Sequence, residues 1–238
     1  MNAAFTNVTN LLRDRSNPQS LKSEAEDDRI DQELENILNR QAPSYNEIDY
    51  WNTRYEREPE PFDWYQTWGR LRPIVLPAVS GRQNALDIGC GNSTLAADLL
   101  EDGFEHVVGY DASSVVIEQN KQRYGNESRL EWICGDVTKM EKIESNKFDF
   151  VIDKGTIDSL MCAGSSARSV TQILAEVARV LKPGGVFVEV SYGTPNTRTS
   201  FLKNPQFGWN LLENQEIEKI TEKDTYHYIY FAQKNSGD

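Results

Sequence analysis

Cysteine and histidine are scarce in this chain of 238 residues. It has three cysteines, Cys90, Cys134 and Cys162, and two histidines, His106 and His227. The cysteines are odd in number and widely spaced, and no two of them form a C-x-x-C pair. The sequence therefore predicts neither a disulfide framework nor a metal site. Free thiols are typical of a reducing compartment, so we expect a cytosolic protein.

Long hydrophobic runs are also missing. No apolar stretch approaches the length of a membrane-spanning helix, so no membrane association is expected. The first twenty residues carry two arginines but lack the apolar core of a secretory signal. A mitochondrial address is weak, because Asp14 and the acidic residues after Ser23 interrupt it. These absences likewise favour a cytosolic location.

Positive charge is in deficit. The chain has 25 basic and 37 acidic residues, for a formal net charge of -12. Such a surface repels phosphate backbones, so a nucleic acid is a poor candidate for a partner. A basic protein or a cationic small molecule would be attracted. Alternatively, the acidity only keeps the protein in solution. The sequence carries no signal for an oligomeric state.

Two regions precede the main pattern. Residues 1–45 are expected to form a flexible extension with one amphipathic helix, which carries Ile30 and Leu34 on one face and ends before Pro43. Residues 46–238 are expected to form the main domain. Its first part, residues 46–80, is rich in aromatic residues and is expected to cap that domain.

Short apolar runs then alternate with helical patterns. Strands are expected over 85–88, 106–110, 130–134, 148–152 and 186–190, and helices over 93–100, 113–124 and 169–181. Two further strand-like runs, 209–220 and 226–233, suit an antiparallel hairpin. The sequence thus predicts an α/β fold with a Rossmann-like, seven-stranded, mostly parallel sheet. Helices would cover both faces, and the C-terminal hairpin would close one edge.

A glycine loop follows the first strand, in the segment Asp87-Ile88-Gly89-Cys90-Gly91-Asn92-Ser93. Glycines here permit a tight turn and a close approach to a ligand. Asp111 ends the next strand, where a carboxylate can accept hydrogen bonds from ribose hydroxyls. Asp136 follows the third strand and could accept a bond from an adenine amino group. The alternative is that both aspartates only cap the helices after them.

The loop favours one class of nucleoside ligand over another. A dinucleotide needs a third glycine and a free helix N-terminus for its pyrophosphate, but Thr94 stands at the third glycine position. Asp87 also places a negative charge at the loop. This arrangement suits a ligand with an amino group and a sulfonium cation, and it disfavours a dinucleotide oxidoreductase.

These motifs resemble those of class I methyltransferases, as does Leu181-Lys182-Pro183-Gly184-Gly185. A narrower resemblance, to the methyltransferase-like 13 group, comes from Asp49-Tyr50-Trp51, Phe62-Asp63-Trp64-Tyr65, Ser114-Val115-Val116 and Asp153-Lys154-Gly155-Thr156-Ile157-Asp158. Within that group the chain looks most similar to the single-domain lysine methyltransferases of translation elongation factor one-alpha. The resemblance covers about residues 45 to 192.

The resemblance implies S-adenosylmethionine as the cofactor and assigns its contacts to matching positions. Those positions are Trp51, Tyr55 and Trp64 in the cap, Gly89 and Gly91 in the loop, Asp111 with Ala112 at the ribose, Asp136 with Val137 at the adenine, and Lys154 after the fourth strand. Aromatic faces attract a sulfonium cation, which agrees with the cap residues. Trp68, by contrast, is expected in the core.

The same resemblance implies methylation of a lysine, with elongation factor one-alpha as the expected basic protein substrate. Asp153 would either orient the incoming amine or pair with Lys154. Asp158 is expected to be a structural acceptor. Two other functions stay open: methylation of a small molecule with the same cofactor half, and a non-catalytic binding module.

Overall fold

A computed structural model describes residues 43–162, 167–220 and 222–236. Residues 44–238 form one compact unit, which is the unit considered below. The predicted amphipathic helix around Ile30 and Leu34 lies outside the described residues.

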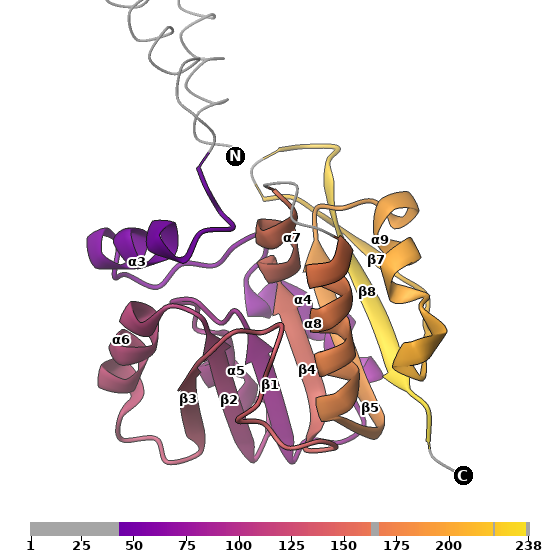
Figure 1. Ribbon diagram of the computed structural model, residues 1–238, viewed down its shortest axis with the longest axis horizontal. Coiled ribbons are helices and arrows are strands. Elements are labelled where there is room, and N and C mark those ends of the chain that lie inside the picture. The colour runs from indigo at the N-terminus through magenta and orange to yellow at the C-terminus, as the bar shows by residue number, and fades with distance from the viewer. Residues whose placement is uncertain (1–42, 163–166, 221, 237–238) are drawn as a thin grey trace, which may run out of the picture. The chain divides into compact units, whose positions relative to one another are not determined.

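The sheet is mostly parallel and has the strand order β3-β2-β1-β4-β5-β8-β6 (Figure 1). Strands β1 to β5 pair in parallel, and β8 runs antiparallel beside β5. The strands are Asn84–Ile88 (β1), His106–Asp111 (β2), Leu130–Cys134 (β3), Phe148–Lys154 (β4), Leu181–Ser191 (β5), Trp209–Leu211 (β6), Gln215–Glu218 (β7) and Tyr226–Lys234 (β8). The predicted fold class is confirmed.

The last position of the sheet differs in detail from the prediction. In place of one strand over 209–220, two short strands, β6 and β7, pair with successive parts of β8. Leu211 lies opposite Ala232 and Gln215 lies opposite Ile229. Three residues therefore separate the paired positions between β6 and β7, whereas two residues separate their partners in β8. The extra residue disrupts the ladder as a bulge does.

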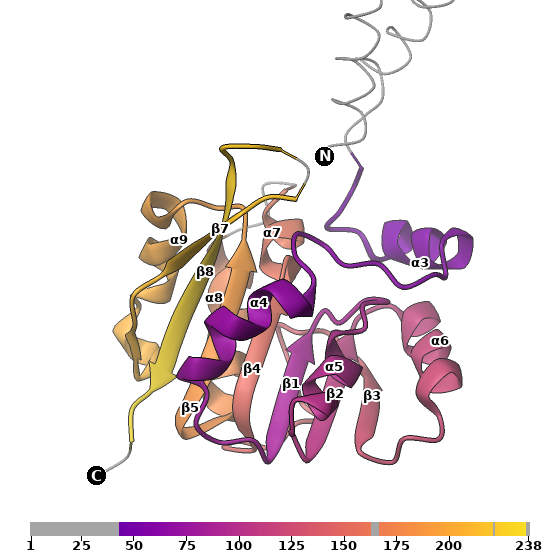
Figure 2. The ribbon, with the colours of Figure 1, turned by 180° about the vertical axis from the view of Figure 1, so that it is seen from behind.

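Helices cover both faces of the sheet (Figures 1 and 2). One face carries Trp68–Val75 (α4), Leu95–Glu101 (α5) and Ser114–Tyr124 (α6), with a 3-10 turn, Leu76–Ala78, after α4. Helix Ile48–Arg57 (α3) lies beyond the carboxyl ends of the strands and contacts α6 (Figures 1 and 2). The other face carries Thr156–Met161 (α7), Ala167–Val180 (α8) and Pro195–Leu202 (α9), followed by the 3-10 turn Pro205–Phe207. Within the described residues, no helix is long and apolar enough to cross a membrane.

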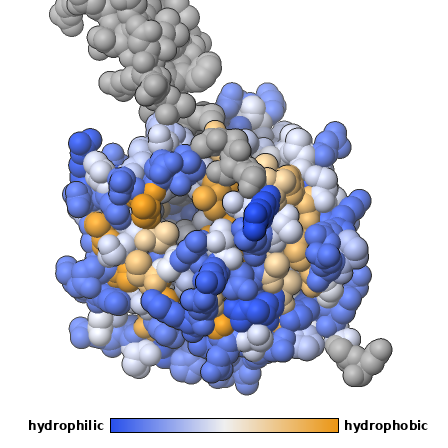
Figure 3. Space-filling view, in the orientation of Figure 1, coloured by the Kyte–Doolittle hydropathy of each residue, from blue (hydrophilic) through white to orange (hydrophobic). Residues whose placement is uncertain are grey.

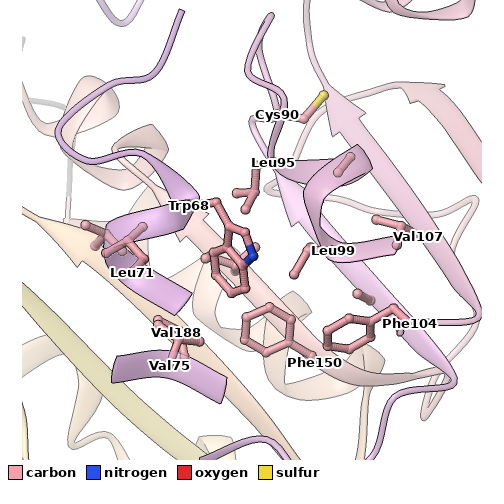
Figure 4. Close-up of a cluster of buried hydrophobic side chains, with 14 of the residues drawn as sticks. Trp68, Leu71, Val75, Cys90, Leu95, Leu99, Phe104, Val107, Phe150 and Val188 are labelled. Atoms are coloured by element: carbon pink, nitrogen blue, oxygen red, sulfur yellow. The ribbon is translucent and has the colours of Figure 1, made fainter. Parts of the chain in front are cut away.

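The aromatic cap is anchored by its own hydrophobic contacts. Trp68 and Leu71 of α4 pack with Leu99 of α5 and Phe150 of β4 in one buried cluster (Figure 4). The Trp68 indole Nε1 donates a hydrogen bond to the Asp102 carboxylate at 2.6 Å. Burial with a satisfied donor is the expected state of a core tryptophan, so the prediction for Trp68 is confirmed.

Candidate active site

The glycine loop joins β1 to α5 at the carboxyl end of the sheet. Gly89 and Gly91 have φ angles of 66° and 53°, a region that side chains rarely adopt. A Cβ atom at Gly89 would lie 1.8 Å from Thr156 Oγ1, and one at Gly91 would lie 2.9 Å from the Tyr55 hydroxyl. The loop therefore needs glycine for both conformation and space, as a close approach to a ligand requires.

Asp111 and Asp136 stand at the ends of β2 and β3, as predicted. Asp111 accepts hydrogen bonds from the backbone N–H groups of Gly91, at 2.9 Å, and Ser113, at 2.8 Å. Asp136 accepts from the backbone N–H and the hydroxyl of Thr138, both at 2.8 Å. Each carboxylate thus orders its own turn, as the capping alternative expected. Each also has further lone pairs for a ligand, since a carboxylate can accept about four bonds.

The cap aromatics gather beside this loop. Trp51 stacks on Tyr55 at 5.9 Å and meets Trp64 edge to face at 5.8 Å between ring centroids. The Trp51 indole donates to the Tyr45 carbonyl at 2.7 Å. Tyr55 is buried, with its hydroxyl over Gly91. Three aromatic residues expected from the sequence are therefore brought together at the glycine loop.

Lys154 ties the cap to the end of β4. Its ammonium forms an ion pair with Asp63 at 3.0 Å and donates to the Trp64 carbonyl at 3.2 Å. The predicted alternative of a pair with Asp153 is wrong, because successive strand residues point to opposite faces of a sheet. Burial raises the pKa of Asp87, near Lys154, to about 7, although the positive charge of Lys154 opposes the shift.

Asp153 is only 1% exposed and caps α7. Its carboxylate accepts hydrogen bonds from the backbone N–H groups of Thr156, at 2.9 Å, and Ile157, at 3.4 Å. Burial, followed by the negative charge of Asp158, raises the pKa of Asp153 to about 7. Asp153 thereby orders the turn that brings Thr156 against Gly89.

A buried network around Asp158 extends beyond what the sequence indicated. The Asp158 carboxylate accepts bonds from the Tyr65 hydroxyl at 2.9 Å and the Ser191 hydroxyl at 2.7 Å, and it pairs with Arg198. Arg198 also lies 2.9 Å from Glu189. The structural role expected for Asp158 is confirmed. Arg198 and Glu189 were missed, because no local motif surrounds them and their partners are distant in sequence.

The remaining predicted residues lie at the same carboxyl end of the sheet. Ala112 follows Asp111 and is exposed, whereas Val137 follows Asp136 and is buried. The molecular surface is hollowed between α3 and α7, and hydrophobic side chains lie at the margin of this hollow (Figures 1 and 3).

This set of carboxylates, glycines and aromatic rings fits an adenosyl cofactor. Carboxylates at adjacent strand ends can accept hydrogen bonds from the hydroxyls and amino group of a nucleoside, a two-glycine loop permits close approach, and aromatic faces suit a sulfonium. Residues 86–188 match a sequence family described as a methyltransferase domain. EEF1A lysine methyltransferase 4 of Bos taurus is 32% identical over 177 residues, which cover 70% of this chain and 69% of that protein. The chain belongs to this family of S-adenosylmethionine-dependent methyltransferases.

Further comparisons agree with this assignment. The human eEF1A lysine and N-terminal methyltransferase is 32% identical over 160 residues, which cover 66% of this methyltransferase but 23% of the human protein. The solved structure of N-methyltransferase NodS from Bradyrhizobium japonicum, in complex with S-adenosylhomocysteine, shares the fold. Its TM-score is 0.56 at 15% identity, and the match covers 81% of this chain and 99% of NodS.

Proposed function

We propose that this methyltransferase modifies a lysine of translation elongation factor one-alpha in the cytosol. The observation that carries the proposal is the match at 32% identity to a relative named as an EEF1A lysine methyltransferase, over 70% of this chain. The net charge of -12 supports a basic protein as the substrate.

The site residues receive matching roles in this proposal. Bound S-adenosylmethionine supplies an activated methyl group and its leaving group. The chain supplies the contacts: the cap aromatics shelter the charged end and exclude water, and the loop and carboxylates hold the nucleoside. The contact residues are Trp51, Tyr55, Trp64, Gly89, Gly91, Asp111, Ala112, Asp136, Val137 and Lys154.

The target lysine must lose a proton before it can attack. Burial and nearby positive charge both disfavour an ammonium, so burial beside the sulfonium of bound S-adenosylmethionine would lower the pKa of an incoming lysine. For Asp153 we assign a positioning role: it holds α7, and α7 places Thr156 beneath Gly89.

Methyl transfer to purified elongation factor one-alpha tests the proposal. The enzyme is incubated with tritiated cofactor and the factor, with Asp111→Ala as the cofactor-site control. We expect label on the factor, located on a lysine by peptide mass spectrometry, and a strong loss of label with the variant. Label confined to a low-mass fraction of a cell extract would instead select a small-molecule methyltransferase.

A further inference from the structure

The hairpin formed by β7 and β8 has two unlike faces. Cross-strand partners share a face of a sheet, and the faces alternate along each strand. Ile217 lies opposite His227. Both are buried, and Gln66 of the cap contacts the His227 ring nitrogen at 3.1 Å. This inner face therefore packs against the body of the enzyme.

The outer face of the hairpin presents acidic and aromatic side chains in register. Glu218 lies opposite Tyr226, and Glu216 lies opposite Tyr228. Ile220 lies two residues beyond Glu218, in the bend that follows β7. Tyr226 and Ile220 are 41% and 60% exposed, and both glutamates are exposed, whereas Tyr228 is half-buried and packs in part against the hydrophobic core. Exposed large apolar residues are informative where they gather on one face, because such patches mark interaction sites.

Each cross-strand pair places a carboxylate next to an aromatic ring. Glu216 forms no ion pair and accepts no side-chain hydrogen bond in the described part of the chain, and Glu218 accepts one bond, from the Asp224 N–H at 3.3 Å. A lysine or arginine can interact with both groups of such a pair: its charge is attracted to the carboxylate and to the π-face of the ring. Successive pairs lie two residues apart, about 7 Å along the strands.

We propose that this outer face, formed by Glu216, Glu218, Ile220, Tyr226 and Tyr228, docks a basic, extended segment of the protein substrate; the inference rests on the proposed function. Alternate residues of an extended chain point the same way and repeat at the same spacing of about 7 Å. The preferred segment therefore carries basic residues two positions apart. An apolar residue beyond them contacts Ile220.

The hairpin lies close enough to the site to serve this purpose. His227, on the inner face between Tyr226 and Tyr228, contacts Tyr65 in a tilted arrangement, at 4.6 Å between ring centroids. Tyr65 follows Trp64, whose carbonyl accepts from Lys154. The hairpin therefore borders the residues at the end of β4 that carries Lys154.

Steady-state kinetics with elongation factor one-alpha test the inference. The double variant Glu216→Gln/Glu218→Gln is compared with Glu101→Gln/Glu105→Gln, which removes the same charge from exposed positions at the opposite end of the sheet. We expect the hairpin variant to raise KM for the factor at least tenfold, with kcat and S-adenosylhomocysteine affinity unchanged. The control should leave KM within twofold of wild type. Equal KM values for the two variants would overturn the inference.

The aromatic contribution has its own comparison. Tyr226→Phe keeps the ring and should keep KM, whereas Tyr226→Leu removes the π-face and should raise KM severalfold. If both substitutions have the same effect, the ring does not contact a cation and the inference fails.

Failure of the proposed substrate can be told apart from failure of the docking surface. If wild type transfers no methyl to the factor, the proposed function is wrong. Binding is then measured by fluorescence anisotropy with a Gly-Ser peptide that carries two arginines two positions apart, and with a peptide whose arginines are adjacent. Tighter binding of the first peptide, lost in Glu216→Gln/Glu218→Gln, supports the surface. Equal binding by wild type and variant overturns it.

Discussion

Gly89 combines a left-handed backbone with a space that has no room for a methyl group. Its φ is 66°, and an added Cβ would lie 1.8 Å from Thr156 Oγ1. Gly89→Ala should therefore destabilise the fold by about 1–3 kcal/mol and displace α7 from the loop. Urea unfolding and S-adenosylhomocysteine titration measure the two effects.

Gly69 provides the matched control for that substitution. It lies in α4, and nothing lies within 4 Å of an added Cβ. Gly69→Ala should be neutral or stabilise the enzyme by up to about 1 kcal/mol, since alanine favours a helix more than glycine does. Equal destabilisation by both substitutions would show that the loop geometry is not special.

Asp87 should make cofactor affinity depend on pH. Burial raises its pKa to about 7, so in the free enzyme the carboxyl becomes neutral as the pH falls through that value. A cationic ligand binds the ionised form better. Affinity for S-adenosylmethionine should therefore fall about tenfold between pH 8 and pH 6. Calorimetry across this range measures it, and Asp87→Asn should remove most of the dependence. A dependence that persists in the variant would assign it to another group.

Among secondary-structure elements, those with a strong hydrophobic period were predictable. Strand β3, Leu130–Cys134, has the predicted bounds, and β1, β2 and α6 differ from prediction by about one residue. Helices α7 and α9 were not predicted, because six or eight residues with little periodicity give no clear signal. Their positions depend on tertiary contacts such as Asp153 at α7.

The site was predictable where it follows strand ends and not where it depends on distant pairs. Asp111 and Asp136 could be placed from the strand pattern alone. The partner of Lys154 could not, since Asp63 is distant in sequence and Asp153 is adjacent. Only the fold shows that Asp63 faces the ammonium, at 3.0 Å.

Helix α9 is anchored by a buried guanidinium. Arg198 is 3% exposed and faces the carboxylates of Asp158 and Glu189. Arg198→Met should cost about 3–5 kcal/mol, because it leaves buried carboxylates without a cation. Burial already raises the pKa of Glu189 well above its usual value, so the folded state binds protons more readily than the unfolded chain. The variant should lose more stability than wild type as the pH rises from 5 to 8.

Arg129 provides the comparison for this helix anchor. It forms an exposed ion pair with Glu127 at 2.7 Å. Arg129→Met should leave the urea midpoint nearly unchanged at every pH, since exposed pairs contribute little. If Arg198→Met also left the urea midpoint unchanged, the buried network would not hold α9.

At the scale of the whole molecule, groups that are far apart in the chain lie together at the carboxyl ends of the parallel strands. The glycine loop follows β1, the two aspartates end β2 and β3, Lys154 ends β4, and the cap brings its aromatic residues to the same end. The hairpin of β7 and β8 lies beside this end of the sheet, where His227 contacts Tyr65. The proposed docking hairpin therefore lies beside the proposed cofactor site.

Calorimetry with S-adenosylhomocysteine tests the central claim, that neighbouring strand ends jointly hold the adenosyl group. Asp111→Ala should weaken binding at least tenfold relative to wild type, about 1.4 kcal/mol. Glu105 is exposed at the opposite, amino end of the strands, so Glu105→Ala should not change the affinity for S-adenosylhomocysteine. Wild-type affinity in Asp111→Ala, with the fold intact by urea unfolding, would contradict the account.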